Sequence, residues 1–138
     1  MPIRIIHPHK KRLVPSAKIK RLIEIISKGE SKKKLGAVSF VFLDNAAMRK
    51  MNKEFLNHDY PTDVISFDLS TGRDIEGEVY IGIDQAAAQA KEYGIPFSNE
   101  ILRLAAHGFL HILGYDDHTP KKRFTMLKLG DDYIAQLK

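Results

Sequence analysis

The chain has 138 residues, of which 43% are hydrophobic and 28% charged, and it contains no cysteine. This composition fits one soluble globular domain spanning residues 1–138, and it excludes disulfides, thiolate nucleophiles and cysteine-bound zinc. A net charge of +5 suits a polyanionic partner such as nucleic acid. The sequence has no secretory leader pattern and no apolar run of about 18 residues, so we expect a cytoplasmic protein without a membrane partner.

The first half of the chain alternates predicted strands and helices. The four predicted elements are a strand over residues 3–7, a helix over residues 16–29, a buried strand from residue 35 to residue 43 and an amphipathic helix over residues 45–57. We expect Ser16 to cap the first helix, and Asp44 or Asn45 to cap the second. Both helices carry apolar residues at helical spacing, which predicts that each packs one face on a sheet.

The second half begins with two runs rich in β-branched and aromatic residues, 63–70 and 77–84, which predict a neighbouring antiparallel pair of strands. Three helices are expected after this pair, over residues 85–94, over residues 96–114, and from Pro120 onward with an interruption or weakening at Gly130. We expect Ser98 or Asn99 to cap the second of these helices and Gly114 to end it. The element order indicates an α+β fold, one small mixed sheet of about four strands packed by about five helices.

The segment HGFLHILGYDDH at residues 107–118 carries the strongest functional signal. His107 and His111 are four residues apart, so a helix places both imidazoles on one face and within reach of one ion. An isolated pair of histidines at this spacing is common without a metal. Here the helix stops directly afterwards, and the chain can bring Asp117 or His118 to the same ion. Three protein ligands leave one coordination position open, which is typical of a catalytic metal site at the end of a helix.

This segment, together with MNKEFLNHDYPTDVISFDLS at residues 51–70 and GEVYIGI at residues 77–83, resembles the bacterial YbeY family of metal-dependent endoribonucleases. The three motifs occur in the family's order and spacing. The resemblance implies a single-strand-specific endoribonuclease that depends on one Zn²⁺ per chain. It further implies a role in maturation of small-subunit ribosomal RNA and in ribosome quality control, with ribosomal RNA and the small subunit as partners.

The family motif, H-G-x-L-H-L-x-G-Y-D-H, has three histidines as metal ligands, and His107 and His111 match the first two. Without a gap in the alignment the third position falls on Asp117, whereas a one-residue insertion assigns it to His118. The gapless alignment needs no backbone adjustment and a carboxylate is an established zinc ligand, so Asp117 is favoured. At the level of sequence both assignments stay open.

Other site residues are less sharply defined. Asp63 and Asp116 are the candidates for proton transfer. The family commonly has an arginine, associated with RNA binding or catalysis, where this chain has Leu56, so another cation is expected to take that role. The candidate substrate-binding cations are Lys10, Lys11, Arg12 and Lys53.

Two other functions use the same motifs. A zinc metalloprotease-like hydrolase would keep the histidines, but the protease signature HExxH has its general base directly after the first ligand, where this chain has Gly108. A non-catalytic RNA-binding ribosome assembly factor would bind RNA without using the metal for chemistry. Such a protein would function normally after loss of a metal ligand.

Overall fold

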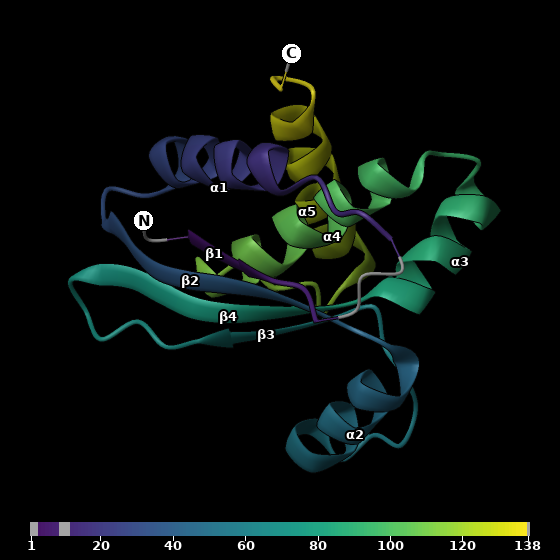
Figure 1. Cartoon of the computed structure of the whole chain (residues 1–138). Helices are drawn as coiled ribbons and strands as arrows, with labels where there is room; N and C mark the ends of the chain where they lie inside the picture. Colours follow the sequence, from purple (N-terminus) through teal and green to yellow (C-terminus); the bar gives the residue numbers. More distant parts are fainter. Residues whose placement is uncertain (1–2, 9–11, 138) are drawn as a thin grey trace.

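The computed structural model describes residues 3–8 and 12–137, which form the predicted α+β fold. Four strands and five helices follow one another in these ranges in the predicted order (Figure 1). The strands are β1 (Ile3–Ile6), β2 (Lys34–Leu43), β3 (Val64–Asp68) and β4 (Asp74–Gly82). The helices are α1 (Ser16–Glu30), α2 (Asn45–Leu56), α3 (Ile83–Tyr93), α4 (Phe97–Ile112) and α5 (Pro120–Ile134). Along the described ranges no helix is both long and apolar enough to span a membrane.

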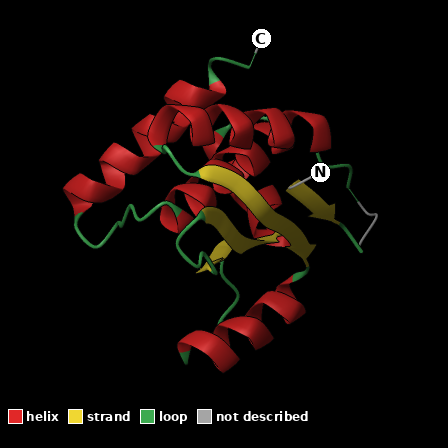
Figure 2. Ribbon diagram, turned by 90° about the vertical axis from the view of Figure 1, so that its left-hand side faces the viewer, coloured by secondary structure: helices red, strands yellow, loops and turns green. Residues whose placement is uncertain are grey.

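The four strands form one mixed sheet in the order β1-β2-β4-β3. β1 and β4 both run parallel to β2, whereas β3 runs antiparallel to β4, which confirms the predicted antiparallel pair. Figure 1 shows α1, α4 and α5 on one face of the sheet and α2 on the other, and the turned view in Figure 2 agrees. The core therefore lies between the sheet and the layer that contains α4.

Helix α4 is the most enclosed element of the fold. It packs against α1, α3 and α5 as well as against β3 and β4. Residues 104–110 of this helix are all buried, and β2 contributes the buried side chains of Val38, Phe40 and Phe42 to the same core. A helix that is apolar on nearly all sides is stable only inside a protein. The stretch 104–110, which includes His107, is thus held in place by packing, whereas His111 at the end of the helix is partly exposed.

The helix starts were predicted only in part. Asp44 caps α2 by accepting a hydrogen bond from the backbone N–H of Ala47 at 2.9 Å. Of the two predicted caps for this helix, Asp44 and Asn45, the first is therefore confirmed. The other predicted caps are wrong, because α1 and α4 begin directly after Pro15 and Pro96 without a side-chain cap. Each proline is the residue before its helix, and its carbonyl accepts a backbone hydrogen bond of the first turn, from Ile19 at 2.9 Å in α1 and from Glu100 at 3.2 Å in α4.

Two glycines in the second half behave differently from each other. Gly114 has φ of +104° and follows the last residues of α4, which confirms that it ends this helix. The predicted interruption at Gly130 is wrong, since α5 continues through it to Ile134. A Cβ atom at position 130 would lie 3.3 Å from the Cβ of Ala106. Glycine at this position therefore allows α5 to approach α4 closely without breaking the helix.

Candidate metal centre

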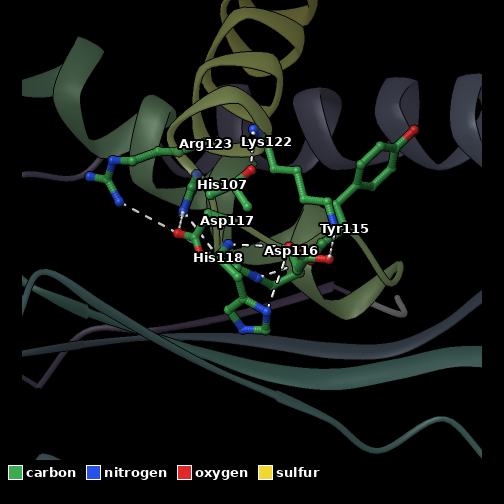
Figure 3. Close-up of polar contacts among 9 residues, drawn as sticks. His107, Tyr115, Asp116, Asp117, His118, Lys122 and Arg123 are labelled. Carbon is green, nitrogen blue, oxygen red and sulfur yellow. Dashed lines mark hydrogen bonds and ion pairs between the residues drawn. The ribbon is translucent and has the colours of Figure 1, made fainter.

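Three side chains of the predicted site meet at the C-terminal end of α4. The Nε2 atoms of His107 and His111 are 3.2 Å apart. The Oδ2 atom of Asp117, in the loop after the helix, lies 3.1 Å from Nε2 of His107 and 3.5 Å from Nε2 of His111. Figure 3 shows the Asp117 carboxylate turned back toward His107. These three residues are the group of potential metal ligands found within the described residues.

The spacing of these three atoms fits a tetrahedral ion. Ligand atoms at about 2.0–2.1 Å from a tetrahedral zinc are about 3.3–3.4 Å from one another. The three distances here, 3.1, 3.2 and 3.5 Å, bracket that value. The three atoms therefore have the spacing of three corners of a tetrahedron, and these residues would leave a bound ion one position for a water molecule or a substrate oxygen.

The protonation states in this site suit metal binding. The Nδ1 atom of His111 lies 3.1 Å from the backbone carbonyl oxygen of Tyr115. A carbonyl only accepts hydrogen bonds, so Nδ1 carries a proton, and Nε2 is the ring nitrogen that faces His107 and Asp117. Burial, followed by the nearby His111, lowers the pKa of His107. Burial raises the pKa of Asp117. The net shift is nevertheless downward, because the pKa is lowered by the nearby His111, by the hydrogen bond with His107 and by the charge of Arg123. A neutral imidazole and an ionised carboxylate are the forms that bind metal.

His118 lies apart from this group. Its side chain is 85% exposed, and its Nδ1 atom is 3.7 Å from a carboxylate oxygen of Asp116. Asp116 also accepts a hydrogen bond from the backbone N–H of His118 at 3.2 Å and pairs with Lys122 at 3.3 Å (Figure 3). The loop therefore turns Asp117 toward the two histidines of α4, and turns Asp116 and His118 to other partners.

A carboxylate at the end of α1 holds the loop that follows α4 in place. The hydroxyl groups of Tyr115 and Tyr133 both donate to Glu30, the last residue of α1. The hydrogen bond to Glu30, followed by burial, raises the pKa of Tyr115. Burial and then Glu30 raise that of Tyr133 to about 12. The carbonyl of Tyr115 orients His111. The contact with Glu30 therefore links the loop after α4, which carries Tyr115 and Asp117, to α1 and, through Tyr133, to α5. Sequence reasoning missed Glu30, since no local pattern links it to residues so distant in the chain.

The three potential ligands line a cleft of about 680 Å³. Arg103 and Glu100, one and two turns before His107 on α4, line it as well. Glu100 is 2% exposed and accepts hydrogen bonds from Gln89 at 2.6 Å and from Arg103 at 3.0 Å. Burial raises its pKa, although both hydrogen bonds oppose that shift. Glu100 and Arg103 were missed, but their helical spacing from His107 is a signal that could have found them.

The remaining predicted residues lie in different places. Asp63 lines the cleft, whereas Asp116 is not among the lining residues. The guanidinium of Arg12 lies 5.2 Å from the ring centre of Phe97, and Lys53 is exposed on α2. Neither of these two cations lines the cleft. Lys10 and Lys11 lie outside the described residues.

Position 108 separates this site from that of a metalloprotease. A Cβ atom there would lie 2.5 Å from Cγ1 of Val79 and 3.0 Å from Oγ of Ser66, which belong to β4 and β3. A side chain at this position would thus collide with the sheet. The general base of the HExxH signature has no equivalent here.

A model of the endoribonuclease YbeY family matches residues 6–138. Among its relatives, an endoribonuclease YbeY from Chlorobaculum parvum is 36% identical over 138 residues, which cover 100% of this chain and 96% of the relative. One from Chloroherpeton thalassium is 40% identical over 127 residues, covering 92% and 89%. A solution structure of a Thermotoga maritima protein matches with a TM-score of 0.68 at 28% identity, covering 98% of this chain and 88% of that one. Since the family model spans the helix with both histidines, the loop after it and nearly all the rest of the chain, this protein belongs to the endoribonuclease YbeY family.

Proposed function

We propose that this endoribonuclease uses one zinc ion per chain to cleave single-stranded RNA in the maturation of small-subunit ribosomal RNA and in ribosome quality control. We place this activity in the cytoplasm, where ribosomal RNA and the small subunit are its partners. The observation that supports the proposal most strongly is the triangle formed by His107, His111 and Asp117 in a chain of this family.

The chain's own residues supply orientation and charge. His107, His111 and Asp117 would hold the zinc, which supplies a Lewis acid for a phosphoryl oxygen and activates water near neutral pH. Packing on α4 directs His107 and the carbonyl of Tyr115 directs His111, so the Nε2 atoms of both rings already lie side by side, 3.2 Å apart. Asp63 lines the same cleft from the start of β3 and is our candidate for accepting or delivering a proton. Asp116 is a weaker candidate, because it pairs with Lys122 outside the cleft.

The two other functions are not favoured. The position of the protease general base is a glycine that packs on the sheet. A purely RNA-binding assembly factor needs no group of two imidazoles and a carboxylate at this spacing. The relatives of this chain are named endoribonucleases.

A hairpin RNA with a long single-stranded loop tests the proposal. We expect purified protein to cut the loop and spare the duplex stem, to lose activity after treatment with a chelator, and to recover it on addition of zinc in preference to magnesium. The fragments are resolved on a sequencing gel, and protein heated beyond its unfolding transition is the control for contaminating nucleases. Cleavage that persists after the chelator would contradict metal dependence, and equal cleavage of stem and loop would contradict single-strand specificity.

A further inference from the structure

The cleft contains more carboxylates than permanently charged cations. The described residues that line the cleft include four carboxylates, those of Asp63, Asp68, Glu100 and Asp117. The same lining contains two permanently charged cations, Arg103 and Arg123. A polyanion that enters such a cleft needs at least one cation that can pair with its phosphates.

Arg103 already has partners on three sides. Its guanidinium lies 3.0 Å from a carboxylate oxygen of Glu100 and 3.4 Å from one of Asp131. It also lies 5.4 Å from the ring centre of Tyr93. The side chain is 27% exposed. Two carboxylates and an aromatic face hold this arginine in place, so its role is to link α3, α4 and α5 at the inner end of the cleft.

Arg123 is in a different situation. It lies in the first turn of α5, and its side chain is 59% exposed. Its Nη1 atom is 3.5 Å from Oδ2 of Asp117, which is a long distance for a hydrogen bond. The same oxygen lies 3.1 Å from Nε2 of His107 and is a corner of the metal triangle. Figure 3 shows the guanidinium reaching across toward Asp117 from the side of α5.

Metal binding changes this contact. When Asp117 donates its carboxylate to a cation, its negative charge is shared with that cation and its attraction for Arg123 weakens. The guanidinium then remains at the edge of the metal site with unused donors. Its planar fork matches two oxygens of a phosphate, a geometry that a lysine ammonium cannot provide.

We propose that Arg123 binds the phosphodiester that RNA presents to the metal site, and that it becomes available for this contact when the metal engages Asp117. This inference rests on the proposed function and names the cation through which that function holds its substrate. Arg123 is thus a substrate-binding residue, whose partner is a pair of phosphate oxygens next to the open coordination position.

The test compares Arg123→Gln with Lys128→Gln in the zinc-loaded full chain. Lys128 lies on the same helix, is 66% exposed and pairs with Asp132. It is not among the cleft residues, so Lys128→Gln removes one positive charge, as Arg123→Gln does, without altering the cleft. The probe is a short single-stranded 2′-O-methyl RNA, checked by mass spectrometry to be intact, and binding is measured by fluorescence anisotropy at several salt concentrations.

We expect Arg123→Gln to weaken binding about 10-fold and to reduce the slope of log K against log salt by about 0.7, the value for one phosphate contact on a single strand. Lys128→Gln should change the affinity less than about twofold. Arg123→Lys should keep most of the salt slope and recover part of the affinity, because it retains the charge without the fork. In metal-free protein, the difference in affinity between Arg123→Gln and the unaltered chain should be smaller than in the zinc-loaded protein.

Equal affinity and equal salt slope for Arg123→Gln and Lys128→Gln would overturn the inference about Arg123, while RNA binding by the unaltered protein would leave the proposed function standing. Zinc-loaded protein that neither binds nor cleaves RNA would overturn both. The zinc content of Arg123→Gln, measured by plasma mass spectrometry, should equal that of the unaltered protein. A loss of zinc would show that Arg123 supports the metal and would also overturn its assignment to the substrate.

Discussion

Replacing His111 with alanine will leave a folded protein that has lost its metal and cleaves RNA more than about 100-fold more slowly. His111 is partly exposed at the end of α4, so its truncation removes little packing. It does remove one of three potential ligands, and even partners that only orient a ligand change metal affinity or activity about 10–100-fold when mutated. The two remaining ligands, His107 and Asp117, are too few to hold an ion tightly.

The measurements are metal content by plasma mass spectrometry, thermal unfolding by circular dichroism and initial rates of RNA cleavage. His58→Ala is the matched control, because His58 is exposed and stacks on Tyr60 at a distance from the triangle. We expect the control to retain its metal and its activity. Unchanged activity in His111→Ala would show that the cleavage chemistry does not use this site.

Replacing Gly108 with alanine will destabilise the protein by about 1–3 kcal/mol, the usual range for overpacking a core. The new methyl group would lie 2.5 Å from Cγ1 of Val79, 3.0 Å from Oγ of Ser66 and 3.1 Å from Cγ2 of Val64. It would also strain the hydrogen bond of 3.0 Å that Ser66 donates to the carbonyl of Gly108. Alanine is intrinsically favoured over glycine in a helix by about 1 kcal/mol, so a net loss would show that crowding against the sheet dominates.

Urea unfolding of Gly108→Ala beside Gly130→Ala measures this effect. Gly130 is also inside a helix and buried, but its added methyl would meet a single neighbour, Ala106, at 3.3 Å. We expect Gly130→Ala to change the free energy of unfolding by less than about 1 kcal/mol, since the gain in helix propensity offsets mild crowding. If Gly108→Ala were as stable as the unaltered chain, α4 would not be packed on the sheet as closely as the structure has it.

The parts of the fold that follow from local patterns were predictable. Apolar periodicity and runs rich in β-branched and aromatic residues indicated each helix and strand in the described ranges, although β4 begins at Asp74, three residues before its predicted start. The spacing of His107 and His111 placed both on one face of α4. The caps at Ser16 and at Ser98 or Asn99 were wrong because the helices begin earlier, so that Pro15 and Pro96 take the cap positions. Propensity for a cap is a local preference, and it does not fix the residue at which a helix begins.

The surroundings of the metal site were not predictable, because they depend on contacts between distant elements. Glu30 meets Tyr115 only when α1 packs beside α4 and α5. Likewise, nothing in the sequence around Arg123 indicates that the first turn of α5 places this arginine beside Asp117. The choice between Asp117 and His118 was open in the sequence, because adjacent residues in a loop can point in opposite directions. The structure brings Asp117, the favoured one, into the triangle.

The most direct test is the metal content of purified protein, measured by plasma mass spectrometry after reconstitution with zinc and removal of excess metal, for the unaltered chain beside Asp117→Ala and His118→Ala. The geometry predicts about one zinc per chain in the unaltered protein and in His118→Ala, and less than about a tenth of that in Asp117→Ala. Loss of zinc in His118→Ala with retention in Asp117→Ala would contradict the assigned ligand set. Unaltered protein that binds no zinc would contradict the metal centre itself.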